Sequence, residues 1–305
     1  METLLKNLIE KNKHWTKKGR VATYIPMLGQ ANPDIFGIAV MDMKGNVYAQ
    51  GDYQYKYTLQ SITKVITLML ALMDRGPQKV FQYVGMEPTG DPFNSIIKLE
   101  TIQPSKPLNP MINAGAIVTA SLVKGDSPEL RFNRILQLAQ KMADNPSITY
   151  NHQIYLSESE TGNLNRALAY FMKNHGVLQG DIEQHLEVYF KQSSIEVTSL
   201  DVARIGAIIA NDGKSITTGE EIIPASIIRI AKTFMITCGM YNASGEFAIK
   251  AGIPSKSGVG GGILSAVPHQ FGIGVIGPAL DEKGNSYAGV KLLEELSETL
   301  NLSIF

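Results

Sequence analysis

The sequence predicts an α+β protein with one antiparallel sheet flanked by helices and a mostly helical second lobe. Three observations lead to this class. A strand pair lies near the amino end of the chain, another lies near the carboxyl end, and the residues between them carry apolar side chains at helical spacing. We expect the two strand pairs to join one sheet. The cleft between the two lobes is the expected place for a functional site.

The first eighteen residues predict a short amphipathic helix. Leu4, Leu5, Leu8 and Ile9 recur at helical spacing, and lysines interrupt any apolar run of the kind that a secretory signal needs. We therefore expect a cytoplasmic protein.

A hairpin and a buried helix follow. Residues 36–43 are apolar and β-branched, the turn residues Lys44-Gly45-Asn46 come next, and residues 47–50 return as the second strand. Residues 61–73 are apolar almost all round, which predicts a helix buried on every side. Arg75-Gly76-Pro77 ends it.

The middle of the chain is predicted to be helical. Its helices are expected at 113–123, 128–143, 162–174, 182–191 and 199–210, and a loop rich in Gly, Pro and Asn is expected at 87–110. Residues 73–219 are therefore assigned to the helical lobe, and residues 1–72 and 220–305 to the lobe that contains the sheet.

The carboxyl-terminal part is predicted to return to the sheet. A helix at 224–237 precedes strands at 262–267 and 271–276, a turn at 281–286 and an amphipathic helix at 287–300. Residues 257–280 are uncharged, but their glycines and prolines favour buried strands over a membrane span.

Composition excludes several classes of partner. The 28 basic residues balance 28 acidic ones, so no broad basic surface is expected for nucleic acid or an anionic membrane. The single cysteine, Cys238, allows neither an intrachain disulfide nor a multi-cysteine zinc site, and we expect it to be a small core residue. The five histidines show no metal-ligand spacing, so we expect no metal.

Ser61-Ile62-Thr63-Lys64 is the first candidate for chemistry. Residues i and i+3 share a helix face, so the Ser61 hydroxyl and the Lys64 amine can meet. Lysine can activate a serine if burial or nearby positive charge lowers its pKa. Ser121 and Lys124 have the same spacing at the end of a predicted helix, and we assign them no function.

Lys256-Ser257-Gly258 is the second candidate, because it precedes a strand and occurs once. Together with Ser-x-x-Lys it is typical of penicillin-recognising serine enzymes. The intermediate Ser-x-Asn or Tyr-x-Asn motif is missing from the chain, which argues against a β-lactam enzyme. The Gly258–Gly262 run lacks a following Lys-Ser/Thr and so is not a phosphate loop.

Longer motifs in the same order resemble a known family, the serine-dependent glutaminases, which are bacterial-type L-glutamine amidohydrolases with a β-lactamase-like, penicillin-binding-like fold. The resemblance covers about residues 24–302. Its motifs are YIP at 24–26, LQSITK at 59–64, NPMINAGA at 109–116, SESETGN at 157–163, SIEVT at 194–198, CGMY at 238–241 and KSGVGGGIL at 256–264.

The resemblance implies a role for each matching residue. Ser61 is the expected nucleophile and Lys64 its base, and Tyr241 is expected to bond the nucleophile and pass a proton to leaving ammonia. The backbone N–H groups of Ser61 and Val259 form the expected oxyanion hole, and Lys256 is an electrostatic helper. The residues expected to hold the two charged ends of L-glutamine are Tyr24, Asn113, Glu158, Asn165 and Tyr189.

Each residue of the last group has an alternative reading without the resemblance. Asn113 and Asn165 could cap helices, Glu158 could be a solvated acid, and Tyr189 could be a core residue. The resemblance also implies a reaction without metal or organic cofactor and a homo-oligomer, either dimer or tetramer. Two other functions remain open: a β-lactam hydrolase or peptidase with the same Ser/Lys pair, and a glutamine sensor without turnover.

Overall fold

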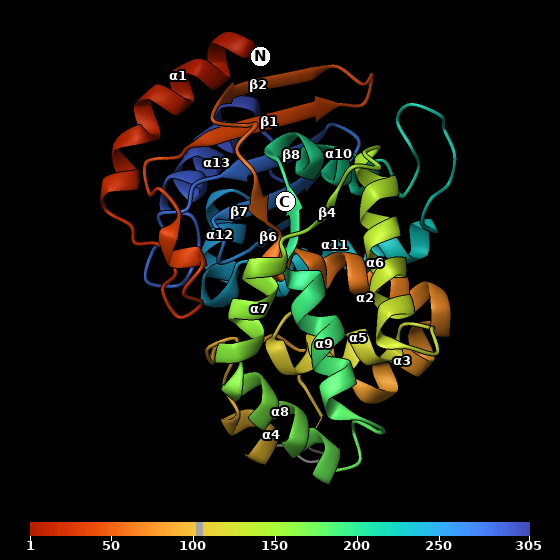
Figure 1. The fold of residues 1–305 in the computed structure, drawn as a ribbon. Coiled ribbons are helices and arrows are strands. Elements are labelled where there is room, and N and C mark those ends of the chain that lie inside the picture. Colours follow the sequence, from red (N-terminus) through yellow and green to blue (C-terminus); the bar gives the residue numbers. More distant parts are fainter. Residues whose placement is uncertain (102–105) are drawn as a thin grey trace.

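A five-stranded antiparallel sheet forms the upper part of the molecule as drawn in Figure 1, a computed structural model that describes residues 1–101 and 106–305. The strand order is β2-β1-β8-β7-β6. These strands are β1 (Gly37–Asp42), β2 (Val47–Gly51), β6 (Ser255–Ser257), β7 (Gly262–Val267) and β8 (Phe271–Ile276). Since β1 pairs with both β2 and β8, strands from both ends of the chain join one sheet, and the predicted α+β class is confirmed.

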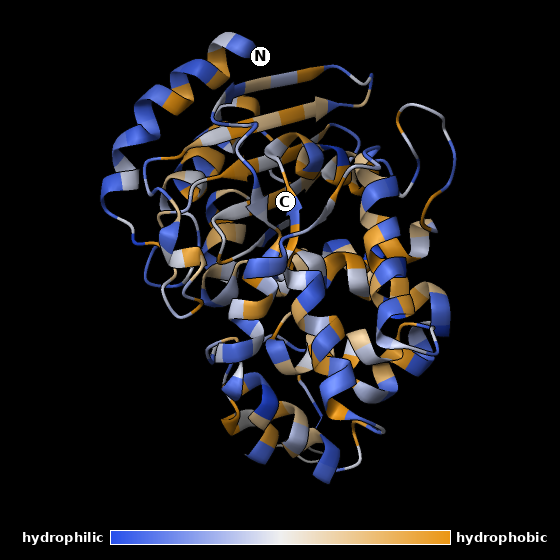
Figure 2. Ribbon diagram, in the orientation of Figure 1, coloured by the Kyte–Doolittle hydropathy of each residue, from blue (hydrophilic) through white to orange (hydrophobic). Residues whose placement is uncertain are grey.

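One face of the sheet packs against the two terminal helices, α1 (Glu2–Asn12) and α13 (Tyr287–Leu300). Alternate strand residues such as Ile38 and Val40 point to this face and share a core with Leu292 of α13. Figure 2 shows hydrophilic and hydrophobic turns alternating along α1, as expected for a helix with one buried side.

The other face packs against α10 (Ser199–Ala210) at unusually short range. A Cβ atom added at Gly272 or Gly274 of β8 would overlap backbone atoms of this helix, and one at Gly206 of α10 would overlap the Ser265 carbonyl. Glycine is therefore required at this contact because no side chain fits between helix and sheet.

The helical part surrounds α2 (Thr63–Arg75), whose residues 63–72 are all buried. Its neighbours include α5 (Asn113–Leu122), α6 (Pro128–Ala143) and α11 (Ala225–Cys238). Figure 1 places α5, α8 and α9 below the sheet. The remaining elements are η1 (Lys13–Lys17), η2 (Leu28–Gln30), β3 (Tyr57–Thr58), η3 (Gln60–Ile62), α3 (Pro77–Tyr83), α4 (Ile97–Thr101), β4 (Thr149–Tyr150), α7 (His152–Thr161), α8 (Asn163–Asn174), α9 (Ile182–Ser193), β5 (Ile195–Val197), η4 (Tyr241–Ala243) and α12 (Ser244–Lys250).

The structure differs from the predicted elements in a few places. The buried helix begins at residue 63 rather than 61, because residues 60–62 form a separate 3-10 turn. A short helix, α4, lies inside the predicted loop 87–110, of which 102–105 lie outside the described residues. The small sheet β3-β5-β4 was not predicted. α10 falls in the segment assigned to the helical lobe but packs on the main sheet, and the division into lobes stays a prediction.

Among the described residues, every helix is too short or too polar to span a lipid bilayer.

Candidate active site

Ser61 lies in a strained turn directly before α2. The preceding residue, Gln60, is buried and has a φ of 48°, a left-handed conformation that is costly for a residue with a side chain. The turn is held by Thr63, whose hydroxyl donates to the Gln60 carbonyl at 2.8 Å, and by Gln60 Nε2, which lies 3.3 Å from Thr58 Oγ1. These contacts hold the backbone on both sides of Ser61.

Lys64 follows Ser61 by one helical turn and is 2% exposed. Its Nζ donates to Asn113 Oδ1 at 2.7 Å and to the Met111 carbonyl at 3.1 Å. Burial lowers the pKa of Lys64 to about 7, and the charge of Glu158 opposes part of that shift. A large fraction of Lys64 is therefore neutral near pH 7, as a general base must be.

Lys256, from β6, lies on the other side of this group. It is fully buried, donates to the carbonyls of Ser257 at 2.6 Å and Gly239 at 3.1 Å, and lies 4.4 Å from the centre of the Tyr241 ring. Burial first, and then the charge of Lys64, lower its pKa well below the usual value. The two lysines are therefore close enough to disfavour each other's charge.

Tyr241 also has a left-handed backbone, with a φ of 52°. Ser244 holds this turn from both sides, since its hydroxyl accepts from the Met240 N–H at 3.0 Å and donates to the Tyr241 carbonyl at 2.8 Å. Buried Asn285 donates to the Met240 carbonyl at 3.3 Å. Burial raises the pKa of Tyr241, and the nearby Ser61 hydroxyl lowers it in part. Within the described residues, the buried Tyr241 hydroxyl has no hydrogen-bond partner of good geometry.

Val259 follows the Lys-Ser-Gly motif in the turn between β6 and β7 and is 5% exposed. Its N–H donates to no acceptor in residues 1–101 or 106–305. Buried backbone donors are nearly always paired, so an open donor beside the Ser61 turn is a ready binding point for an anionic oxygen. The turn lies close to the serine segment because Gly258 and Gly260 leave room for the Leu59 and Thr58 carbonyls.

The residues expected to hold the substrate come from four different helices and one loop. Glu158 lies on α7, Asn113 on α5, Asn165 on α8 and Tyr189 on α9. Asn113 Nδ2 donates to Asn165 Oδ1 at 3.0 Å, so a hydrogen-bonded chain runs from Lys64 through Asn113 to Asn165.

Electrostatics show that the acidic and phenolic members of this group face one another. After burial, the charges of Glu158, Tyr24 and Tyr241 raise the pKa of Tyr189. Burial raises the pKa of Glu158 to about 8, against the effects of a hydrogen bond from Gln60 and the charge of Lys64. One oxygen of Glu158, Oε2, is buried without a partner among the described residues. The structure thus brings all the predicted site residues into one region.

These positions exclude the alternative readings of Asn113, Asn165 and Glu158 but not that of Tyr189. Asn113 is the first residue of α5 and Asn165 lies inside α8, and neither side chain caps its helix. Glu158 is 6% exposed and is therefore not a solvated acid. Tyr189 is packed in an apolar cluster, as the core reading expected, but it also faces Glu158.

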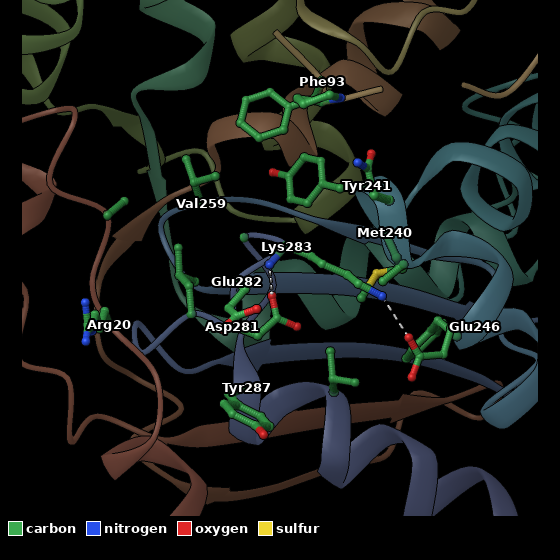
Figure 3. Close-up of a pocket in the computed structure, with 18 of the residues that line it drawn as sticks. Arg20, Phe93, Met240, Tyr241, Glu246, Val259, Asp281, Glu282, Lys283 and Tyr287 are labelled. Carbon is green, nitrogen blue, oxygen red and sulfur yellow. Dashed lines mark hydrogen bonds and ion pairs between the residues drawn. The ribbon is translucent and has the colours of Figure 1, made fainter. Parts of the chain in front are cut away.

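A large cleft opens from this region to solvent (Figure 3), with a volume of about 1240 Å³. Tyr241, Val259 and Tyr24 line its inner part. Tyr24 is 56% exposed and therefore lies at the entrance.

Sequence reasoning missed two residues of the site. The Phe93 ring lies 4.8 Å from the Tyr241 ring and 5.9 Å from Lys64 Nζ, and its carbonyl accepts from the Asn113 N–H at 2.8 Å. No pattern around Phe93 signals this position. Gln60 could have been singled out because it directly precedes the candidate serine. The Ser-x-x-Lys pair at Ser121 and Lys124 has no such surroundings, since the Ser121 hydroxyl donates to the Val118 carbonyl within its own helix.

In the described part of the chain, no group of three His, Cys, Asp or Glu side chains is placed to hold a metal ion. Cys238 is partly buried next to Lys256, and burial raises the pKa of its thiol, so it is a poor nucleophile.

The fold of this chain is that of bacterial amidohydrolases that act on glutamine. The glutaminase family model matches residues 19–305. A glutaminase of Alkaliphilus metalliredigens is 55% identical over the full length of both chains, and one of Clostridium botulinum (strain Loch Maree) is 56% identical, also over both full lengths. The chain belongs to the glutaminase family, and the predicted resemblance is confirmed.

A solved structure of a relative confirms the predicted β-lactamase-like fold. A Bacillus subtilis glutaminase in covalent complex with 5-oxo-L-norleucine, formed by reaction with 6-diazo-5-oxo-L-norleucine, is 37% identical to this chain. It superposes with a TM-score of 0.90 over 100% of this chain and 99% of that one.

Proposed function

We propose that this protein hydrolyses L-glutamine to L-glutamate and ammonia through an ester of the γ-glutamyl group with Ser61. The observation that carries the proposal is a set of open polar atoms in one buried region. Glu158 Oε2, the Tyr241 hydroxyl and the Val259 N–H all lack partners within the described residues. Buried polar groups without partners are costly, and a zwitterionic amide substrate supplies a partner for each.

Recognition of the free amino acid rests on its two charges. The Glu158 carboxylate pairs with the α-ammonium group, and Asn113, Asn165, Tyr189 and Tyr24 offer amide and phenol donors to the α-carboxylate. Because both ends are held, a free glutamine is preferred over glutamine within a peptide.

The reaction then follows from the positions of the catalytic groups. Neutral Lys64 accepts the Ser61 proton as Oγ attacks the side-chain carboxamide, and the N–H groups of Val259 and Ser61 stabilise the developing oxyanion. Tyr241 passes a proton to the departing nitrogen, and ammonia leaves. Water attacks the ester by the reverse sequence and releases glutamate.

Labelling with 6-diazo-5-oxo-L-norleucine tests the nucleophile directly. The compound forms a covalent complex with the B. subtilis relative, and we expect one adduct per chain here, located on Ser61 by peptide mass spectrometry. Ser61→Ala should remain unlabelled and release no ammonia from glutamine, whereas Ser121→Ala should behave as wild type. An adduct on Ser61→Ala would disprove the assignment.

Two rival functions give different results in the same preparation. A β-lactam hydrolase or peptidase would cleave a chromogenic β-lactam or a peptide and leave glutamine intact. A sensor would bind glutamine in calorimetry without ammonia release.

The proposed enzyme is a cytoplasmic homo-oligomer, either dimer or tetramer. Light scattering of the purified protein measures the oligomeric state, and cell fractionation measures the location.

A further inference from the structure

A short connector, residues 192–196, runs from the end of α9 into β5 and contacts several parts of the chain that carry site residues. It overlaps the SIEVT motif at 194–198, to which the proposed reaction assigns no role. Tyr189 lies one helical turn before Gln192 on α9, so the two side chains share a face of that helix. The connector is therefore continuous with one wall of the substrate site.

Two hydrogen bonds join the connector to the segment that carries the proposed nucleophile and base. The Leu59 N–H donates to the Ile195 carbonyl at 2.8 Å, and the Thr67 hydroxyl donates to Gln192 Oε1 at 2.6 Å. The nucleophile and the base lie between these two points in the sequence. Both ends of their segment are therefore fixed to the same connector.

The connector also holds the start of α7, the helix that carries Glu158. Asn151 caps this helix, since its side chain accepts from the Ile154 N–H at 3.1 Å. The Asn151 N–H donates to the Ser194 carbonyl at 2.8 Å, and its Nδ2 donates to Glu196 Oε1 at 3.1 Å. The helix with the proposed ammonium-binding carboxylate is thus anchored at the same place.

The pair formed by Thr67 and Gln192 is the buried side-chain contact of this connector. Thr67 is 1% exposed and Gln192 is fully buried, and Gln192 Nε2 has no partner among the described residues. An open buried N–H costs free energy, whereas an apolar pair of the same shape can be neutral or stabilising. Stability therefore does not account for this polar pair.

We propose that Thr67 and Gln192 are positioning residues for the reaction. Thr67 follows Lys64 by one turn of α2, and Gln192 follows Tyr189 by one turn of α9. Their bond fixes how these two helices lie against each other, one turn away from the base and the substrate. The inference rests on the ester mechanism of the proposed function, in which a small displacement of the base from the substrate lowers the rate steeply.

The test is a double variant in which both partners become apolar without much change of shape, Thr67→Val with Gln192→Met. Its free energy of unfolding in urea should equal or exceed that of wild type. Its kcat for ammonia release from L-glutamine should fall about tenfold, and KM should change by less than about twofold. All rates are expressed per active chain, counted by labelling to completion with 6-diazo-5-oxo-L-norleucine.

Two single variants serve as controls. Thr67→Ser keeps the hydroxyl that reaches Gln192 and should recover most of the wild-type kcat. Thr119→Val makes the same change at a fully buried threonine whose hydroxyl donates at 2.6 Å to the Gly115 carbonyl of its own helix. Because that bond joins no second element, Thr119→Val should keep the wild-type kcat.

The outcomes separate positioning from folding. A wild-type kcat in the double variant would refute the proposal, and so would a loss of activity matched by an equal loss of labelled chains. A loss of kcat as large in Thr67→Ser would also refute it. If the double variant does not fold, Thr67→Val alone decides by the same kcat per labelled chain. No ammonia from wild type would instead overturn the proposed function.

Discussion

Replacing Glu158 by glutamine removes a buried carboxyl group, whose ionised form is the one that pairs with the substrate's ammonium, with almost no change of shape. Its Oε2 atom is open in the structure, and the substrate's ammonium group is the proposed partner. Loss of one charge-assisted contact in a buried site costs about 2–3 kcal/mol, which corresponds to a decrease in kcat/KM of about 30- to 150-fold. We expect most of this loss in KM, because the ammonium lies away from the reacting amide.

The same variant should change the pH dependence in a defined direction. Lys64 has a pKa of about 7 and acts when neutral, so wild-type kcat should fall as the pH drops through about 7. The charge of Glu158 raises this pKa against burial. Glu158→Gln removes that effect, so the pKa of Lys64 should decrease and kcat should persist to lower pH than in wild type.

Glutamate formation, followed with glutamate dehydrogenase between about pH 5.5 and 9, gives both readouts. Glu160→Gln is the matched control, since Glu160 is an exposed carboxylate on the same helix. An unchanged kcat/KM would remove Glu158 from the substrate site. If the acidic side of the kcat–pH profile of Glu158→Gln does not move relative to wild type, or moves to higher pH, the role of Lys64 as base is contradicted.

Three further changes test other parts of the structure. Tyr241→Phe should lower kcat by about 10²–10³-fold with little change in KM, because the lost group transfers a proton; steady-state kinetics measure this. Ser244→Ala removes both hydrogen bonds around the left-handed turn of Tyr241 and should lower kcat about tenfold with a smaller effect on KM, as expected when a group acts through another. Gly274→Ala should destabilise the fold by about 3 kcal/mol in urea unfolding because its Cβ would overlap α10, whereas Gly245→Ala, with open space around it, should be near neutral.

Much of the fold could be predicted because the decisive signals are local. α6, α10 and α13 have the predicted bounds, and each begins at a Ser or Thr whose side chain caps the helix. β7 and β8 also have the predicted bounds, since their apolar runs are separated by a clear turn.

The elements that sequence reasoning missed lack such signals. β3 and β4 are two residues long, too short for any alternation of polar and apolar residues to be recognised. α7 has no strong apolar face, and Glu158 is its one buried residue. The surrounding helices bury Glu158, and no amphipathic pattern within α7 predicts that burial.

The site residues also differ in whether a local sequence signal reveals them. Ser61 and Lys64 are detectable because one helical turn joins them. Asn113, Glu158 and Asn165 lie on separate helices, and only the family resemblance named them. The burial of Asn113 and Glu158, and the hydrogen bond between Asn113 and Asn165, depend on tertiary packing that no single segment encodes.

The contact between the Gly258–Gly260 turn and the Thr58–Leu59 carbonyls has a consequence for inactivation. At this contact the turn that carries Ser61, the proposed nucleophile, meets the turn that carries the Val259 N–H, the proposed oxyanion donor. A displacement of a few tenths of an ångström between these two turns would misalign the proposed nucleophile and donor. Activity would then be lost while the hydrophobic cores on both sides of the contact stayed intact. Activity should therefore be lost at a lower temperature or denaturant concentration than helical structure, as measured by circular dichroism. Substitutions that stabilise the contact between these two turns should lengthen the half-life of activity more than substitutions that enlarge either core.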